Sequence, residues 1–163
     1  MIAAEILARS GIEVNVLDKD AKPGERKPCA GMLRDAAVRM FGVPTDLACR
    51  RITGIRLIMP NHRVEEVEYG HPIFWNFDRG ILGQHLIRRA RKAGAKVSTS
   101  TQVVDIARLD GATSTNHELT IRNPEHGTTK SKLDLVIAAV VVNSIVVKKT
   151  GVFTRLKPSQ LGQ

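Results

Sequence analysis

Asp18 is the first side chain whose type and position could do chemistry. It directly follows a β-rich run, Ile12–Leu17, which itself follows an apolar helical segment, Ile2–Arg9, that ends at Gly11. In a dinucleotide-binding βαβ unit, a carboxylate at the tip of the second strand accepts hydrogen bonds from a ribose. The order of helix, glycine, strand and acid therefore predicts a nucleotide contact at Asp18. The plainer alternative is an acidic residue that opens a surface loop.

Cys29, Ala30 and Gly31 form the second candidate. They follow a charged loop and precede Gly31–Phe41, a segment that the sequence predicts to be a short helix. Gly31 leaves backbone amides open to a ligand, and a helix N-terminus adds partial positive charge. A thiol in that position has its thiolate form favoured. The alternative is an ordinary loop with a half-buried cysteine.

Arg79 is the third candidate, because it lies in the first turn of a predicted helix over Arg79–Ala93 with Asp78 as its N-cap. A cation at that end opposes the helix dipole and costs about a few tenths of a kcal/mol. An arginine in this position is better explained if its guanidinium binds a phosphate. The alternative is a solvent-facing arginine. The basic run Arg88–Lys92 is interpreted as a solvated helix face. The expected buried stripe of this helix is Leu82, Leu86, Ala90 and Ala93.

The other segments predict a mixed α/β fold. Ile52–Met59 and Val64–Tyr69 alternate as two strands of an antiparallel hairpin. Three more strands are expected to form a meander, and a last apolar strand follows them: Val103–Leu109, His117–Arg122, Thr128–Leu133 and Leu135–Val142. Helix–strand pairs interrupted by hairpins indicate a parallel nucleotide-binding sheet with an antiparallel insertion.

Composition limits the class of protein. The net charge of +9 favours polyanionic partners such as phosphate-bearing cofactors, anionic lipid surfaces or nucleic acid, and the alternative is a solvated basic surface. A nucleic-acid-binding module is disfavoured, because aromatic residues for base stacking make up only 4% of the chain. The five histidines show no ligand spacing, so no metal is predicted. Two cysteines without a CxxC spacing fit a reducing, cytoplasmic setting. No apolar stretch approaches the ~20 residues of a membrane span, so any membrane association would be peripheral.

Three motifs together resemble the geranylgeranyl reductase family of FAD-dependent oxidoreductases. They are Lys-Pro-Cys-Ala-Gly-Met-Leu at 27–33, Phe-Asp-Arg-Gly-Ile-Leu at 77–82, and Leu-Val-Ile-Ala-Ala at 135–139 with Asn-Ser at 143–144. The archaeal branch, which saturates digeranylgeranylglycerophospholipids, is the most similar. The resemblance implies an α/β fold: a partial FAD-binding Rossmann-like domain of the aromatic-hydroxylase type, with an antiparallel β insertion.

The resemblance also implies roles for the matching residues. Asp18 would hold the adenosine ribose, Arg79 would reach the FAD pyrophosphate, and the backbone of Val103 would meet the adenine. The flavin-lining segment would comprise Cys29, Ala30, Gly31 and Leu33. By the same resemblance Cys29 would take part in catalysis, and either Cys29 or water would supply the proton.

What the family does gives further expectations for this chain. Family members reduce FAD and deliver hydride to isolated C=C bonds of isoprenoid chains. The resemblance therefore implies FAD as cofactor, an isoprenoid lipid substrate, and reduced nicotinamide, ferredoxin or another flavin as electron donor. It implies a cytoplasmic protein, with peripheral contact at the cytoplasmic membrane as one option, and no nucleic-acid partner.

Departures from the family pattern leave alternatives open. The glycine-rich phosphate turn of the family would lie before Met1, and its substrate portion would follow Gln163. Residues 1–163 are therefore expected to be a partial FAD-binding domain. Val140 and Val141 stand where the family carries Asp-Gly. A valine side chain cannot accept a hydrogen bond from a cofactor hydroxyl. The alternatives are an inactive fragment, such as a pseudogene product, and a related FAD-dependent monooxygenase.

Overall fold

The computed structural model describes residues 1–25, 29–110, 115–139 and 149 of the chain. The chain forms two compact units and crosses between them three times, twice inside strands and once in the loop after Ala21. The first unit comprises Met1–Val16 and Lys22–Val97, and the second comprises Leu17–Ala21 and Ser98–Gln163.

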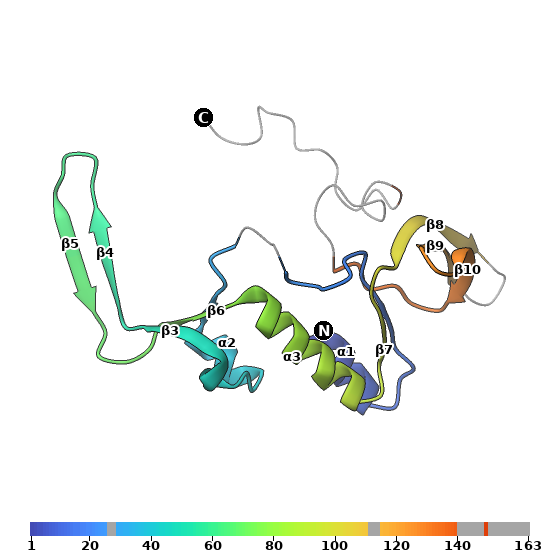
Figure 1. Cartoon of the computed structure of the whole chain (residues 1–163), viewed down its shortest axis with the longest axis horizontal. Helices are drawn as coiled ribbons and strands as arrows, with labels where there is room; N and C mark the ends of the chain where they lie inside the picture. Colours follow the sequence, from blue (N-terminus) through green and yellow to red (C-terminus); the bar gives the residue numbers. More distant parts are fainter. Residues whose placement is uncertain (26–28, 111–114, 140–148, 150–163) are drawn as a thin grey trace. The chain divides into compact units, whose positions relative to one another are not determined.

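The first unit contains most of the helical structure (Figure 1). Its elements are α1 (Ile2–Arg9), β2 (Met32–Arg34), α2 (Asp35–Met40), the 3-10 turn η1 (Thr45–Leu47), β3 (Ala48–Ile52), β4 (Gly54–Ile58), β5 (Val64–Glu68), β6 (Phe74–Phe77) and α3 (Arg79–Lys92). The strands β1 (Asn15–Leu17) and β7 (Lys96–Ser98) contain the boundary between the units.

Strands β1 and β7 pair in parallel. The Val14 carbonyl accepts from the Lys96 N–H at 2.9 Å, and the Asp18 N–H donates to the Ser98 carbonyl at 2.9 Å. Residue numbers rise together along both strands, which is the parallel arrangement. The predicted helix Ile2–Arg9 is confirmed, and the strand after it is shorter than expected because it begins at Asn15.

Helices α1 and α3 lie side by side, as Figure 1 shows. Their contact is a small aliphatic cluster in which Ala4, Ala90 and Ala95 are buried. Alanine side chains let two helices approach closely, so this packing fixes α3 against α1 without large side chains.

The segment that follows Gly31 is not the predicted helix over 31–41. It first forms β2, which pairs antiparallel with β6 with Met32 opposite Asn76, and α2 begins only at Asp35. Gly31 has a φ of +67°, which is outside the helical region, and pairing with β6 satisfies the backbone of this segment instead. Within α2, Val38 is buried whereas Met40 is exposed.

A three-stranded antiparallel sheet in the order β2-β6-β3 forms the main core of the first unit. One side of it packs on a cluster of buried residues contributed by α2, the loop after it, β6 and α3: Val38, Val43, Phe77 and Leu82. The sequence patterns did not indicate β3 or β6 as separate strands. The predicted hairpin is confirmed as β4 and β5, with Gly54 opposite Glu68.

Helix α3 is confirmed with its cap. The Asp78 carboxylate accepts a hydrogen bond from the Ile81 N–H at 2.9 Å, and the helix ends before Gly94, whose φ is +104°. Leu82 and Ala90 of the predicted stripe are buried, and Ile87, which was not predicted, is buried with them.

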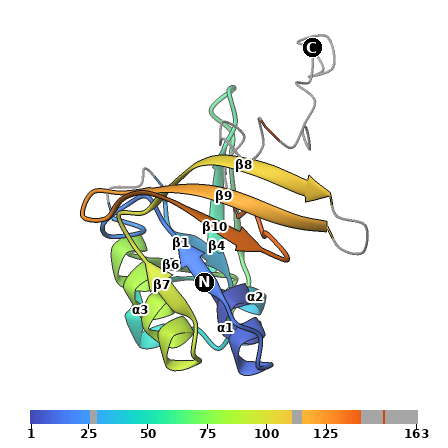
Figure 2. The same ribbon diagram turned by 90° about the vertical axis from the view of Figure 1, so that its right-hand side faces the viewer.

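The second unit contains the predicted meander, which is confirmed with longer strands (Figure 2). Strands β8 (Gln102–Asp110), β9 (Thr115–Asn123) and β10 (Gly127–Leu133) form one antiparallel sheet in the order β10-β9-β8, around buried Ile106 and Leu119.

The strand predicted over Leu135–Val142 is wrong for its described part. Residues 135–139 carry no strand, and the side chains of Leu135 and Ile137 are exposed. A strand needs a hydrogen-bonded neighbour, and none of the strands that the structure describes pairs with this segment. Residues 140–142, with Val140 and Val141, and the Asn-Ser pair at 143–144 lie outside the described residues.

Candidate functional site

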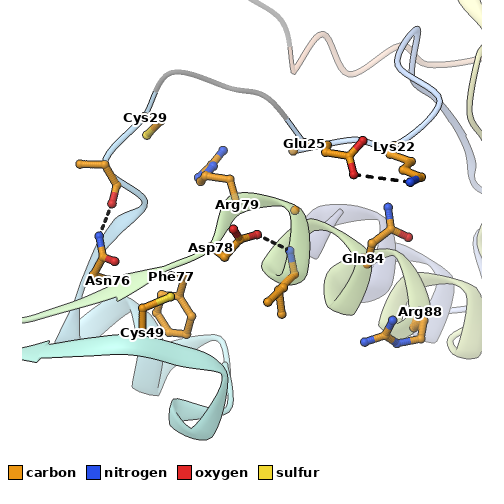
Figure 3. A pocket seen from close by; sticks show the side chains of 14 residues that line it. Lys22, Glu25, Cys29, Cys49, Asn76, Phe77, Asp78, Arg79, Gln84 and Arg88 are labelled. Carbon is orange, nitrogen blue, oxygen red and sulfur yellow. Dashed lines mark hydrogen bonds and ion pairs between the residues drawn. The ribbon is translucent and has the colours of Figure 1, made fainter.

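An open pocket of about 850 Å³ lies in the first unit, within the volume range of small-molecule and cofactor sites. Figure 3 shows side chains from loop 22–25, from the segment before β2, from β3 and from the start of α3 around it. The lining residues that matter for its chemistry are Cys29, Ala30, Asn76, Arg79, Gln84 and Arg88.

The segment Cys29–Gly31 is held on the end of β6. The Phe77 N–H donates to the Gly31 carbonyl at 3.0 Å, and the Asn76 side-chain amide donates to the Ala30 carbonyl (Figure 3). A Cβ at Gly31 would lie 2.0 Å from the Phe77 carbonyl oxygen. Only glycine allows this approach together with a φ of +67°.

Two further glycines let loop 22–25 lie directly on α3. A Cβ at Gly24 would lie 2.2 Å from the Arg79 carbonyl oxygen, and one at Gly83 would lie 2.4 Å from the Pro23 carbonyl oxygen. The loop and the first two turns of the helix therefore form one wall of the pocket, with Arg79 on it.

The charges that line the pocket favour an anion. Glu25 lies 3.5 Å from the Lys22 ammonium, and the Asp78 carboxylate is used by the helix cap. Within the part of the chain that the structure describes, no carboxylate is within ion-pair distance of Arg79 or Arg88. Both guanidinium groups are therefore available to a ligand, close to the positive end of the α3 dipole in the case of Arg79.

Cys29 is exposed and does not stand before a helix. Its Sγ accepts a weak hydrogen bond from the Gly31 N–H at 3.5 Å, and β2 separates it from α2. The sequence-based argument that a helix N-terminus favours the thiolate is therefore wrong. A ligand could still reach the thiol, because Cys29 lines the pocket.

Cys49 lines the same pocket, and no sequence pattern indicated it as a site residue. It lies at an irregularity of β3, where the register against β6 shifts between Ala48 and Arg50. An extra residue in one strand re-aims the side chains next to it. Because β3 was not predicted, neither this bulge nor the thiol on it could be expected.

The remaining members of the predicted flavin segment do not line the pocket. Gly31 fixes the turn against Phe77, and Leu33 packs on the buried cluster of Val38, Val43, Phe77 and Leu82. The structure thus brings Cys29, Ala30 and Arg79 to one cavity, with Gly31 and Leu33 as support.

Asp18 and Val103 belong to the second unit. The Asp18 carboxylate accepts from the Asp20 N–H at 2.9 Å through Oδ1, and Oδ2 has no hydrogen-bond partner among the residues the structure describes. Val103 lies in β8 beside a register shift, and its side chain packs on the Ile106 cluster. A cavity of about 320 Å³ in this unit is lined by Lys19, Ala21, Ser100, Gln102, Arg122 and Pro124.

Helix α3 also carries a second polar cluster, on the side that faces α1 and α2. Arg89 pairs with buried Glu5 at 2.9 Å and donates to the carbonyls of Phe41 and Gly42. Burial, reinforced by Arg89 and Arg88, lowers the pKa of His85. The basic run 88–92 is therefore not uniformly solvated, because Arg88 lines the pocket and Arg89 holds three elements together.

Sequence relatives of this chain are prenyl reductases. The geranylgeranyl diphosphate reductase of Synechocystis is 30% identical over 158 residues, which are 90% of this chain and 37% of that protein. The Rhodobacter capsulatus protein of the same name is 34% identical over 99 residues, covering 61% of this chain and 25% of that protein. Digeranylgeranylglycerophospholipid reductase 2 of Methanothermobacter thermautotrophicus is 28% identical over 169 residues, covering 98% and 41%. No protein-family model matches the chain.

Solved structures give the fold. A geranylgeranyl bacteriochlorophyll reductase-like protein from Thermoplasma acidophilum matches 83% of this chain and 34% of its own, with a TM-score of 0.72 at 17% identity. Aklavinone-11 hydroxylase, solved with FAD and aklavinone, matches 92% of this chain and 32% of its own chain, with a TM-score of 0.68 at 16% identity. Such identities establish the fold alone, and the predicted Rossmann-like flavoprotein fold is confirmed. The chain spans 25% to 41% of the sequence relatives named above, and over that stretch it is a homologue of the geranylgeranyl reductases.

Proposed function

We propose that this chain supplies the FAD-holding part of a reductase that saturates C=C bonds of geranylgeranyl chains. The observation that carries the proposal is the convergence of Cys29 and Ala30 with Arg79 on one pocket, although they are far apart in sequence. These are the residues that the family resemblance assigns to the flavin and to the pyrophosphate. The relatives' names supply the reaction class and the prenyl substrate.

The pocket residues suit a dinucleotide cofactor. Arg79 offers a guanidinium with no competing carboxylate among the described residues, next to the first turn of α3, where an anion is favoured. Gly24 and Gly31 let the backbone approach the carbonyls of Arg79 and Phe77, with which a Cβ at either glycine would collide. This wall can accept a phosphate group without rearranging a salt bridge.

Asp18 and Val103 are proposed to contact the adenosine part of FAD, as the family resemblance implies. Oδ2 of Asp18, which has no partner among the described residues, can accept a hydrogen bond from a ribose hydroxyl, and Val103 lies on the strand of Gln102, which lines a cavity of the second unit. We propose residues 1–163 as a partial FAD-binding domain, for which relatives more than twice as long as this chain supply the precedent.

FAD, when bound, would supply the transfer of hydride to the alkene. The chain's own residues hold and orient it: Arg79 offsets the charge of the diphosphate, and Asn76 fixes the Ala30 carbonyl and with it the turn that bears Cys29. The Cys29 thiol reaches the pocket and is proposed as the proton donor, with water as the alternative. Reduced nicotinamide or ferredoxin is proposed as the electron donor.

The substrate is proposed to be an isoprenoid lipid. One relative's name specifies a diphosphate and another's a glycerophospholipid, and both specify geranylgeranyl chains. A peripheral position at a membrane surface would give access to such a substrate. None of the helices that the structure describes is long and apolar enough to cross a membrane.

Titration with FAD tests the proposal. Trp75 is the only tryptophan and lies on β6, next to Asn76, so that bound flavin should quench its fluorescence. Arg79→Gln should weaken FAD binding by roughly 10- to 100-fold, since hydrogen bonds to charged groups contribute about 1.5–3 kcal/mol. Lys92→Gln, at the other end of the same helix, is the matched control. Equal affinity for the two variants, or no quenching at all, would contradict the proposal.

The two cysteines allow a separate test of the flavin side. Both are exposed and line the pocket, so each single-thiol variant should react with iodoacetamide. If Cys29 faces the flavin, saturating FAD should slow alkylation of Cys29 in Cys49→Ser much more than alkylation of Cys49 in Cys29→Ser. Equal protection would remove Cys29 from its proposed place beside the flavin.

A further inference from the structure

The β4–β5 hairpin carries an apolar stripe along one face. Ile55 is opposite Val67 in the antiparallel register, and Leu57 lies two residues further along the same face. The Met59 N–H donates to the Arg63 carbonyl, and the Tyr69 N–H donates to the Thr53 carbonyl, which extends this register at both ends. The five apolar side chains on this face are 37% to 48% exposed: Ile55, Leu57, Met59, Val67 and Tyr69.

The opposite face of the hairpin is different in kind. Arg56 is directly opposite Glu66 and pairs with it at 2.5 Å, and Glu68 lies on the same face. Only one apolar pair, Ile58 and Val64, lies on this side, at the turn. The stripe is therefore a continuous feature of one face, and the hairpin is amphipathic.

Nothing that the structure describes completes this small sheet. Strands β4 and β5 form a two-stranded sheet, and neither pairs with another described strand. A two-stranded hairpin is marginal in water unless further strands or a covering layer bury its apolar side. Burying a stripe of this length requires a covering layer that runs along the whole hairpin.

We propose that this stripe is a docking surface for the portion of a geranylgeranyl reductase polypeptide that this chain does not match. The Synechocystis and Methanothermobacter relatives are more than twice as long as this chain, since it covers 37% and 41% of them. Their remaining length is sufficient to supply strands that extend the hairpin and an apolar layer that covers the stripe.

The charges of the hairpin argue for a protein partner and against a lipid surface. Between Gly54 and Tyr69 there are two arginines and three glutamates, so the hairpin is not basic although the whole chain is. On the stripe face itself, Arg63 pairs with Glu65 at 2.7 Å. An anionic membrane would be attracted by clustered, unpaired cations, and this hairpin lacks them.

Co-expression tests this inference. The probe is the longer of the segments of the Synechocystis reductase that its alignment with this chain leaves out, produced beside the tagged 163-residue chain. The wild-type chain should retain the segment on purification, and Leu57→Lys should reduce retention at least tenfold. Ile58→Lys is the matched control, one residue away on the opposite face. Val67→Thr, which keeps the side-chain shape, should give a smaller loss and guards against misfolding of the lysine variant.

The outcomes separate this inference from the proposed FAD site. Leu57→Lys should bind FAD like the wild-type chain, since residue 57 does not line the pocket. Equal retention in the two lysine variants, or an insoluble segment beside the wild-type chain, would overturn the inference. So would a wild-type dimer that Leu57→Lys alone dissociates, or Leu57-dependent flotation with phosphatidylglycerol vesicles.

Discussion

The first unit contains two antiparallel sheets that differ in what covers them. The β2-β6-β3 sheet packs through Phe77, which is 3% exposed, on a cluster that includes Val38 and Leu82. The β4–β5 hairpin leaves its apolar stripe exposed. The covered sheet can hold Cys29–Gly31 in one conformation, because burial and backbone hydrogen bonds fix the strand on which the segment rests. An uncovered sheet cannot hold a site in one conformation in this way, but its exposed apolar face can bind another polypeptide segment.

Truncating one apolar side chain in each sheet should give the largest contrast. Phe77→Ala removes a buried ring and should lower the free energy of unfolding by about 3–5 kcal/mol. Leu57→Ala, in the exposed hairpin, should change it by no more than about 0.5 kcal/mol. Urea titrations followed by Trp75 fluorescence measure both. A comparable loss in Leu57→Ala would mean that the hairpin is already covered in the isolated chain.

Two glycines with the same backbone angle sharpen the comparison. Gly31 and Gly70 both have a φ of +67°, but a Cβ at Gly31 would meet the Phe77 carbonyl, whereas one at Gly70 has nothing within 4 Å. Gly70→Ala should therefore cost only the left-handed strain, about 1–2 kcal/mol.

Gly31→Ala adds a steric clash and should cost about 1–3 kcal/mol more. It should also weaken FAD binding, because the turn that bears Cys29 must move. Thermal unfolding and the fluorescence titration measure the two effects. An equal loss of stability at the two positions would show that the β2–β6 contact can rearrange at little cost in free energy.

The elements that local chemistry determines could be predicted from the sequence. Helix α3 has its cap at Asp78 and its end at Gly94, and the hairpin and the meander follow from alternation and turn residues. The segment 31–34 could not be predicted, because its conformation is set by β6, more than forty residues away. The strand expected at Leu135 fails for a related reason, since alternation and apolarity do not supply a partner strand.

The same division holds for the candidate site. Cys29 stands out in the sequence because Gly31 follows it closely. Arg79 stands out because it lies at the start of a helix. Their common pocket depends on how β2 and loop 22–25 lie against β6 and α3, which no local pattern encodes. Cys49 and Arg88 enter the pocket only through a bulge and a helix face that the fold selects.

The cap of α3 should have a smaller effect than Phe77→Ala or Gly31→Ala. Asp78→Ala removes the acceptor of the Ile81 N–H and should lower stability by about 1 kcal/mol. Asp78→Asn retains an oxygen acceptor and should lose only part of this. Urea titrations of the two variants measure the difference. An equal loss in both would indicate that the charge of Asp78, rather than its hydrogen bond, stabilises the helix.

His85 should give the smallest effect, a change in how stability depends on pH. Its pKa is lowered from the ordinary 6.5, first by burial and then by Arg89 and Arg88 on its own helix. Asp46 of η1 and Glu5 of α1 oppose this only in part.

The folded chain therefore takes up a proton on His85 less readily than the unfolded chain. Stability is complete above about pH 6.5 and decreases as the pH falls below that value. His85→Gln should flatten the dependence between pH 5.5 and 7.5 in urea titrations, because glutamine does not titrate. If the variant keeps the full slope, the acid sensitivity of this helix comes from the carboxylates that face it, and His85 contributes packing alone.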